Sequence, residues 1–486
     1  MNANRISGRQ SEMSVLERAL KSPDPEFVAV YGRRRVGKTF LVREYFGDCI
    51  CFELTGLHDA SMPEQLENFA EALGRAMKSG IQPRTPKSWR EAFRELEQFL
   101  ESPSFPRRRG GKRVVFLDEL PWLDTRRSRF SSALEHFWNS WASRQNDLIL
   151  VVCGSAASWM IQNIVQARGG LHNRVTRRIR LLPFSLGETE AYLRSRGVDL
   201  TRYQLAELYM AMGGVPHYLK EAEPGLSAAQ IVDNACFSSQ GLLRDEFARL
   251  YASLFDDPEQ HVAIVKALAR KREGLTRGEL LTISGLRSGG TATKRLEELE
   301  ESGFLLRSVP FGKKENDALY RLADEFSLFH VTWMQSLGRK SPGDGHWLRQ
   351  SQSQRWRAWS GYAFEGVCLK HTARLKAALG IAGVGSTEAP WRHRAVGPSK
   401  ERGVQIDLLI DRNDQTVNLC EMKFSDSEFR IDKRYADVLR RKRDTFRRET
   451  GTRKNVFLTM VTTFGVADNA YARELVANSF TIDSLF

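Results

Sequence analysis

Short apolar runs alternate with helix-length amphipathic segments along the first third of the chain. Between Phe27 and about Leu182 these runs are FVAVY, CICFEL, RVVFLDE, LILVVCG and RRIRLLPF. Apolar runs of this length, spaced by helical segments, are typical of strands buried in a parallel sheet. The pattern therefore predicts an α/β domain with a parallel sheet at the front of the chain.

Helical spacing dominates after Ser185, which predicts a helical lid behind the sheet. Farther on, three amphipathic helices precede two strands joined by a polar hairpin, and either Ser288 or Thr291 is the expected N-cap of the third helix. Three helices followed by a β-ribbon form the winged helix-turn-helix arrangement. A further helix follows this block.

The last part of the chain again predicts an α/β fold. A helix through WSGYAFEGVCLKH precedes two strands in VQIDLLIDRNDQTVNLCEMKF, a basic helix from Asp432 to Thr450, a strand NVFLTMVT and a closing helix. A Gly- and Gln/Ser-rich stretch before this block is typical of a linker. The expected parts are a sheet domain at 1–184, a helical lid at 185–257, a winged helix with its returning helix at 258–340, a linker at 341–354 and a C-terminal α/β domain at 355–486.

The composition is that of a folded protein with a basic surface. The 486 residues exceed one ordinary core and suggest roughly two to four domains. Lys and Arg number 73 against 59 Asp and Glu, which gives a formal net charge of +14. This excess favours polyanions such as DNA as partners, although solvated basic side chains alone also produce it.

The cysteine pattern and the apolar runs bear on the compartment. Six cysteines are scattered without the spacing of a zinc site, which favours a reducing environment. The first residues show no apolar signal segment, and the run LILVVCGSAA is about half as long as a bilayer requires. We therefore expect a cytoplasmic protein without a membrane partner.

A phosphate-binding motif follows the first predicted strand. The segment GRRRVGKT satisfies G-x-x-x-x-G-K-T between a strand and a helix. Gly32 and Gly37 allow backbone N–H groups to surround the phosphates of ATP, and the start of the helix adds its positive dipole. Lys38 is expected to contact the β- and γ-phosphates, and Thr39 to ligate Mg²⁺.

Two acids end the third predicted strand, VVFLDE. Asp118 is expected to hold Mg²⁺ and Glu119 to orient or deprotonate the attacking water, although a pair of solvated acids is the simpler alternative. Ser155, at the end of LILVVCGSA, is a candidate contact to the γ-phosphate or the water. Arg174 is a candidate contact to a phosphate within its own chain or in a neighbouring subunit, which would imply a homo-oligomer.

These motifs together resemble the archaeal-type P-loop ATPases of the AAA+/STAND group. The resemblance covers about the first 335 residues and includes GRRRVGKT, VVFLDE, RIRLLPFS and GGVPHYL. It implies that Gly214-Val215-Pro216 senses bound nucleotide from the lid. It also implies that Gly8, Arg9 and Glu12 lie near the adenine, as in the Gly-Arg-x-x-Glu segment of that group.

The predicted winged helix has two interpretations. Its third helix offers basic and hydroxyl side chains to DNA, and the hairpin adds Lys313 and Lys314. Those side chains are Arg287, Thr291, Thr293, Lys294 and Arg295. Four glutamates at 297, 298, 300 and 301 would repel phosphates, and in related ATPases this domain often serves as an intramolecular lid.

Carboxylates interrupt the two apolar runs of the C-terminal block. Asp407 lies in VQIDLLID, and Glu421 and Lys423 follow in LCEMKF with one residue between them, so they face one side of a strand. The turn DRNDQT would pair these strands as a hairpin and bring Asp407 to Glu421. With Glu365 upstream, the set suits Mg²⁺- or Mn²⁺-assisted phosphodiester hydrolysis.

This arrangement resembles the PD-(D/E)XK nuclease superfamily. The resemblance implies that Glu365 lies on the first helix, Asp407 on the second core strand and Glu421-x-Lys423 on the third, with Tyr435 and Lys442 on the helix that follows. Gln405 stands where many relatives carry an acid, and solvated acids on an amphipathic hairpin are the simpler alternative.

Three functions are consistent with these motifs. The first is a protein that binds and hydrolyses ATP and thereby regulates a metal-dependent DNA nuclease domain, in defence or in the processing of mobile elements. The second is an ATP-dependent DNA-binding or signalling switch with an inactive nuclease-like domain. The third is a ring or clamp in which Arg174 serves a neighbouring subunit.

Overall fold

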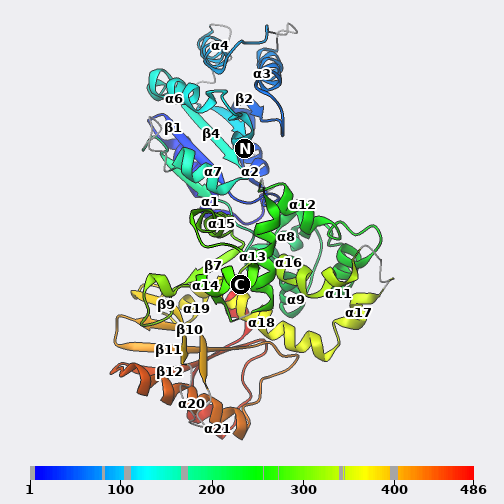
Figure 1. The fold of residues 1–486 in the computed structure, drawn as a ribbon, viewed down its shortest axis with the longest axis vertical. Helices are drawn as coiled ribbons and strands as arrows, with labels where there is room; N and C mark the ends of the chain where they lie inside the picture. Colours follow the sequence, from blue (N-terminus) through cyan, green and yellow to red (C-terminus); the bar gives the residue numbers. More distant parts are fainter. Residues whose placement is uncertain are drawn as a thin grey trace. The chain divides into compact units, whose positions relative to one another are not determined.

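The computed structural model describes residues 6–78, 83–102, 111–165, 173–255, 257–271, 273–338, 343, 345–393 and 403–486. They form two compact units, Met1–Pro183 and Phe184–Phe486. Figure 1 shows the helices and strands with their labels.

The first unit contains a five-stranded parallel sheet in the order β2-β3-β4-β1-β5. Its helices and strands are α1 (Gln10–Lys21), β1 (Glu26–Tyr31), α2 (Lys38–Phe46), β2 (Ile50–Thr55), α3 (Met62–Met77), α4 (Trp89–Glu101), β3 (Arg113–Asp118), α5 (Leu120–Leu123), α6 (Phe130–Ser140), β4 (Leu148–Gly154), α7 (Ala157–Met160) and β5 (Arg177–Arg180). The predicted parallel sheet is thus confirmed. Because β4 lies between β1 and β3, the carboxyl ends of these three strands meet at one edge.

Helices cover both faces of this sheet (Figure 1). One face packs on α1 and α2 through residues such as Val28, Val30 and Leu41. The other face packs on α3, α4 and α6 through residues such as Phe27 and Ala29. Alternate residues of β1 therefore enter different cores, and for this reason its sequence is apolar throughout.

The second unit begins with a helical region. Its helices and strands are α8 (Leu186–Ser195), α9 (Arg202–Met212), α10 (Pro216–Leu219), α11 (Ala228–Val232), α12 (Glu246–Ala252), α13 (Pro258–Arg270), β6 (Leu275–Thr276), α14 (Arg277–Ser284), α15 (Gly290–Glu301), β7 (Leu305–Ser308), β8 (Leu319–Leu322), α16 (Glu325–Phe329), α17 (His346–Gln350), α18 (Gln354–Lys370), α19 (Thr372–Ala378), β9 (Ser386–His393), β10 (Val404–Arg412), β11 (Thr416–Lys423), α20 (Lys433–Thr450), β12 (Asn455–Thr462), α21 (Ala470–Leu475) and β13 (Val476–Phe480). Helical structure from Ser185 onward agrees with the pattern in the sequence.

The block from α13 to β8 contains three helices and a small antiparallel sheet in the order β6-β8-β7. The two-residue strand β6 was not predicted, since so short a strand leaves no periodic signal. The predicted N-cap of the third helix was wrong. Helix α15 begins at Gly290, and its N-cap is Gly289, which has no side chain to accept a hydrogen bond from the helix. Neither Ser288 nor Thr291 is therefore the N-cap.

The C-terminal sheet has the order β13-β12-β11-β10-β9. The strands β9, β10 and β11 are antiparallel neighbours, whereas β12 and β13 continue the sheet in parallel. Two of these strands were not predicted. Strand β9 contains Pro390 and exposed polar positions, and β13 is a half-exposed edge strand that follows α21 without a turn signal.

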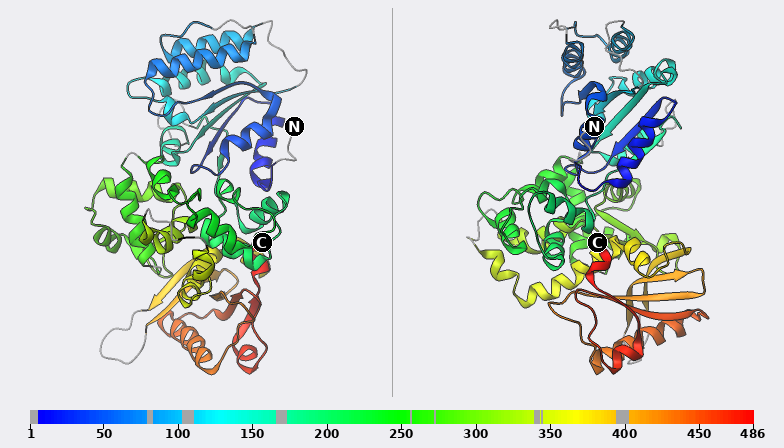
Figure 2. Two further views of the ribbon diagram at one scale, coloured as in Figure 1. Left: turned by 90° about the vertical axis from the view of Figure 1, so that its right-hand side faces the viewer. Right: turned by 180° about the vertical axis from the view of Figure 1, so that it is seen from behind.

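The two faces of this sheet pack on different helices (Figure 2). Leu408, Ile410 and Cys420 face the core that includes α18. Leu409 and Leu419 face the core that includes α20. Residues that alternate along β10 and β11 thus alternate between two cores.

The predicted linker was wrong where the structure describes it. Residues 346–350 form α17, and Trp347 is buried between the rings of Trp333 and Trp356. The carboxylate of Asp233 accepts the backbone N–H groups of Gly345 and Trp347 across 2.8 and 2.6 Å. A polar composition suggested a linker, but one tryptophan fixes the segment to the core. Residues 341, 342 and 344 lie outside the described part.

Within the described ranges, every helix is too short or too polar to cross a bilayer.

Candidate functional site

The phosphate loop lies between β1 and α2, at the carboxyl edge of the first sheet. Lys38 begins α2 and is 5% exposed. Its ammonium donates to the backbone carbonyl oxygens of Gly32 and Arg33, both at 2.9 Å. A Cβ on Gly32 would lie 2.2 Å from the carbonyl oxygen of Leu181, so this position excludes every other residue type. The loop therefore encloses the lysine that the sequence singled out.

Three further predicted side chains join the loop. Lys38 donates to the hydroxyl of Ser155 across 3.0 Å. That hydroxyl donates to Glu119 across 2.6 Å, and the backbone N–H of Ser155 donates to the same carboxylate across 3.1 Å. Thr39 donates its hydroxyl to Asp118 across 2.8 Å. One connected group thus spans the ends of β1, β3 and β4.

The backbone at Glu119 adopts an uncommon conformation. Its φ of 47° lies in the left-handed region, which non-glycine residues occupy at a cost of about 1 kcal/mol or more. The backbone N–H of Glu119 donates to the Asp118 carboxylate across 3.0 Å. This turn directs two consecutive acids to different partners, Asp118 to Thr39 and Glu119 to Ser155.

The N-terminal segment contacts the phosphate loop. Arg9 is 4% exposed and donates to the backbone carbonyl of Val36 across 3.2 Å. Its guanidinium also lies 3.6 Å from the carboxylate of Glu12. Of the three residues that the resemblance placed near the adenine, Arg9 thus bonds to the loop, and Glu12 is joined to it through Arg9.

Arg174 does not join this group. Strand β5 pairs first at Arg177, opposite Val28, and ends at Arg180, opposite Tyr31. Arg174 precedes β5 at the amino edge of the sheet, whereas the loop follows β1 at the carboxyl edge. The paired part of β5 alone is ~10 Å long, at a rise of ~3.3 Å per residue, so the two edges lie at least that far apart. The predicted contact to a phosphate of its own chain therefore fails, and a contact in a neighbouring subunit stays a prediction.

Close packing explains a glycine in the Gly214-Val215-Pro216 element. The backbone N–H of Phe184 donates to the carbonyl of Gly214 across 2.6 Å. A Cβ on Gly214 would lie 1.9 Å from the carbonyl oxygen of Phe184. Pro216 then starts α10. The predicted nucleotide-sensing role of this element stays a prediction.

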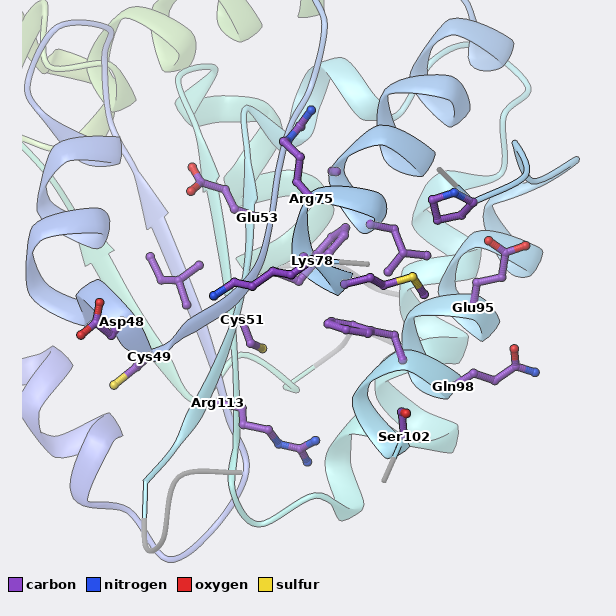
Figure 3. A pocket seen from close by; sticks show the side chains of 18 of the residues that line it. Asp48, Cys49, Cys51, Glu53, Arg75, Lys78, Glu95, Gln98, Ser102 and Arg113 are labelled. Carbon is purple, nitrogen blue, oxygen red and sulfur yellow. The ribbon is translucent and has the colours of Figure 1, made fainter. Parts of the chain in front are cut away.

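A broad hollow of about 1390 Å³ lies beside β2, the edge strand of the first sheet. Figure 3 shows that side chains from several elements line it, among them Glu53, Arg75, Lys78 and Arg113. Its described lining contains no residue of the phosphate loop. The hollow is thus separate from the nucleotide site.

In the second unit, β10 and β11 form the predicted hairpin. The pairing of these strands ends at Leu408 and Cys420, and Asp407 and Glu421 are the next residues beyond this last pair. Strand β10 shifts register against β9 between Ile406 and Leu409. Such a bulge bends the strand and redirects a side chain. Asp407 lies at this bulge.

Helix α20 supplies the partners of Glu421. The hydroxyl of Tyr435 donates to this carboxylate across 3.2 Å, and Lys442 forms an ion pair with it. The ammonium of Lys423 lies 5.4 Å from the centroid of the Tyr435 ring. The resemblance singled out all four residues, and the structure brings them together.

Asp407 pairs with a side chain that the sequence did not indicate. The guanidinium of Arg321, on β8, lies 3.1 Å from this carboxylate, and Gln405 donates to it across 2.8 Å. Burial opposes the charge, but Arg321 and Gln405 outweigh burial and hold the pKa of Asp407 below its usual value. The one signal for Arg321 was an arginine at an inward position of the strand LYRL.

Glu365, on α18, completes the group. Burial and then the charge of Asp407 raise the pKa of Glu365 above its usual range, whereas Lys423 and Arg321 oppose this rise. These interactions place Glu365 within electrostatic reach of the hairpin. Three elements of the C-terminal domain, α18, β10 and β11, therefore direct carboxylates to one region.

The expected cation cage is not assembled in this conformation. Across the described ranges, no three or more His, Cys, Asp or Glu side chains are arranged to hold a metal ion. Asp407 and Glu421 are each paired with a basic side chain instead. An acid in a buried strand needs a compensating charge, and here the protein supplies it.

Known proteins resemble the front part of the chain. Residues 7–222 match a family described as an ATPase domain predominantly from Archaea. This part of the chain is thus similar to an archaeal-type ATPase domain. An uncharacterized protein of Methanocaldococcus jannaschii is 23% identical over 446 residues, which cover 89% of this chain and 91% of that protein. That similarity necessarily extends beyond the ATPase domain into the C-terminal region.

Two solved structures show low similarity to this chain. The Walker-type ATPase of Pyrococcus abyssi gives a TM-score of 0.45 at 18% identity, over 68% of this chain and 97% of that one. The ORC2 protein of Aeropyrum pernix, in its ADPNP–ADP complexes, gives 0.42 at 16% identity, over 68% and 95% of the two chains.

Proposed function

We propose that this protein binds and hydrolyses ATP and thereby regulates a metal-dependent DNA nuclease domain at its C-terminal end. The observation that supports the nuclease assignment is the meeting of Glu365, Asp407 and Glu421 with Lys423. These residues come from α18 and from the second and third strands of the last sheet, which is the order that the PD-(D/E)XK resemblance implies. Glu421 is buried and Asp407 half-buried within apolar strands, which argues against an ordinary solvated surface.

The phosphate loop supports ATP hydrolysis at the front. Lys38 is held where its ammonium can pass from the loop carbonyls to the β- and γ-phosphates. Thr39 and Asp118 are oxygen donors 2.8 Å apart and would hold Mg²⁺, which neutralises phosphate charge. Glu119, fixed by Ser155, would orient the attacking water and accept its proton.

The carboxylate group supports phosphodiester hydrolysis at the back. Glu365, Asp407 and Glu421 offer only oxygen donors, which suits Mg²⁺ or Mn²⁺. Such an ion polarises the scissile phosphate and lowers the pKa of a bound water. Lys423 would stabilise the charge that develops on the phosphate, and Tyr435 would orient Glu421.

DNA is the substrate that the charge favours. The chain carries a net charge of +14, and α20 presents exposed basic side chains beside the carboxylate group. These exposed side chains are Lys433, Arg434, Arg441, Arg447 and Arg448. We infer that α20 contacts the phosphate backbone, which positions DNA without reading its sequence.

A second function is favoured by a different observation. Gln405 replaces an acid, and Arg321 already neutralises Asp407. Both features suit a nuclease-like domain that no longer cuts, in an ATP-dependent DNA-binding or signalling switch. In that case we infer that the block from α13 to β8 is a winged helix that serves as an intramolecular lid.

Cleavage assays separate these functions. Supercoiled and linear DNA are incubated with the full chain and Mg²⁺ or Mn²⁺, with and without ATP. The first proposal predicts metal-dependent cleavage whose rate changes with ATP. DNA binding without cleavage under every condition would favour the switch.

A further inference from the structure

The partner of Asp407 comes from outside the C-terminal α/β domain. Arg321 lies on β8, 86 residues before Asp407, and its side chain is 10% exposed. The left-handed Gly274 makes room for it, since a Cβ there would lie 3.0 Å from the Arg321 side chain. The guanidinium is therefore buried against a carboxylate of the candidate metal site.

Two of the three carboxylates already have a cation as partner. Arg321 lies 3.1 Å from Asp407, and Lys442 forms an ion pair with Glu421. A divalent ion would add two positive charges beside these cations, which is costly at low dielectric. Uptake of the ion therefore requires that a cation leave.

Arg321 is the cation that is able to leave with its own element. Lys423 lies on β11, and Lys442 on α20 is packed against the same sheet, so both belong to the domain that carries the acids. Arg321 belongs to the small sheet β6-β8-β7. A shift of that sheet removes one charge and leaves the carboxylates in place.

The small sheet is docked on the C-terminal domain. The backbone N–H of Phe311, in the hairpin between β7 and β8, donates to the carbonyl of Pro390 across 2.9 Å. The Phe311 ring lies 5.7 Å from that of Phe446 on α20. Arg392 of β9 forms an ion pair with Glu273 at 3.2 Å. These contacts hold β8 against the site.

The passage beside Glu365 is narrow. A crevice of about 50 Å³ separates β7 and β8 from α18, and both Arg321 and Glu365 line it. This volume has room for about one or two water molecules and excludes a DNA strand. The docked sheet thus covers the side of the site from which Glu365 is reached.

We propose that β8 restrains the carboxylate site: the Arg321 guanidinium occupies the place of a cation beside Asp407, and a divalent ion binds when the small sheet withdraws. This restraint rests on the proposed nuclease function. It makes the block from α13 to β8 an inhibitor of the site rather than a platform for DNA.

The test is Mn²⁺ binding and DNA cleavage by the full chain with Arg321→Gln, without nucleotide. The matched control is Arg307→Gln on the neighbouring strand β7, which breaks a more exposed ion pair with Glu315. Phe311→Ala is a second variant that loosens the docked hairpin and leaves the acids and cations intact. Circular dichroism checks that each variant is folded.

We expect Arg321→Gln to raise the Mn²⁺ affinity and the cleavage rate at limiting Mn²⁺ roughly tenfold, within the usual range of coupling between sites. Phe311→Ala should act in the same direction, and Arg307→Gln should match the wild type. Unchanged affinity and cleavage in Arg321→Gln and Phe311→Ala, with an active wild type, would overturn the restraint alone. Slower cleavage in Arg321→Gln would overturn it too, since Arg321 would then assist the reaction. Absence of Mn²⁺ binding and cleavage in every variant would overturn the nuclease function itself.

Discussion

The hydroxyl of Thr39 lies 2.8 Å from the carboxylate of Asp118, although the two residues are 79 positions apart in the chain. The parallel sheet creates this contact, because β1 and β3 end at the same edge on either side of β4. A hydroxyl and a carboxylate at this separation offer adjacent oxygen ligands to one Mg²⁺.

Substitutions of Thr39 and Lys38 should affect ATP binding in different ways. Thr39→Val should leave ATP binding without Mg²⁺ nearly unchanged and abolish the gain in affinity from Mg²⁺. Lys38→Ala should weaken ATP binding at least about tenfold, because hydrogen bonds to charged groups contribute ~1.5–3 kcal/mol. Fluorescent-nucleotide titrations with and without Mg²⁺ distinguish the two. Normal nucleotide affinity in Lys38→Ala would refute the phosphate-loop assignment.

Glu119→Gln should separate binding from hydrolysis. The glutamine still accepts the hydroxyl of Ser155 but is a far weaker base, so hydrolysis should slow ~10²- to 10⁴-fold while ATP affinity is retained. Phosphate release under saturating ATP measures this. The control is Glu53→Gln, which removes an acid paired with Arg43 on the same unit. Equal loss of activity in both variants would argue against a special role for Glu119.

The C-terminal acids should be dispensable for ATP hydrolysis. Lys423→Ala and Asp407→Ala should each lower DNA cleavage by about 100-fold or more, the usual effect of losing a group that stabilises developing charge. ATP hydrolysis should be intact in both. Asp411→Asn, on the same strand but paired with Lys454, is the matched control. Wild-type cleavage by both Lys423→Ala and Asp407→Ala would reject the site assignment.

His371 should make the second unit sensitive to acid. Its Nε2 accepts the backbone N–H of Leu186 across 3.0 Å, which requires an unprotonated nitrogen. Burial lowers the pKa of His371 to about 4. Because this pKa lies below the unfolded value, stability is full above about pH 6.5 and falls as the pH drops toward 4. As the pH falls from 7 to 5, this histidine should lower the free energy of unfolding by about 2 kcal/mol, because it binds a proton in the unfolded state.

Urea unfolding of the wild type and of His371→Gln at several pH values measures this effect. Burial also lowers the pKa of His330 to about 4, so the two histidines act in the same direction. His371→Gln should therefore flatten the pH dependence, and His330→Gln is the comparison that retains His371. Identical slopes for His371→Gln and the wild type would contradict the assignment.

The front of the chain was predictable because one physical signal dominated it. A strand such as Val114–Leu117 is apolar on both faces, since helices cover both sides of a parallel sheet. Asp118 and Glu119 then lie at the end of such a strand, and Lys38 and Thr39 follow another across the phosphate loop. The contact of Arg174 to a phosphate of its own chain was wrong, because a residue that precedes a parallel strand lies at the amino edge of the sheet, away from the phosphate loop.

The C-terminal site was less predictable because its ion pairs join residues on different elements. Glu421 and Lys423 are recognisable in the sequence as charged residues within an apolar strand. Arg321 gave almost no signal, since nothing in the strand LYRL indicates that its acid partner lies 86 residues later. Strand β9 was missed for a related reason, because Pro390 and exposed positions conceal a strand that only its pairing with β10 stabilises.

The burial of Trp347 limits where this protein can be truncated. Its ring lies 5.2 Å from those of both Trp333 and Trp356, and Asp233 fixes its backbone from more than a hundred residues earlier. A fragment that starts at residue 355 would lack Trp333 and Trp347 and would leave the buried ring of Trp356 facing water. Expression of the last α/β block alone should therefore yield an aggregation-prone protein, whereas a fragment that begins near Phe184 keeps its core whole.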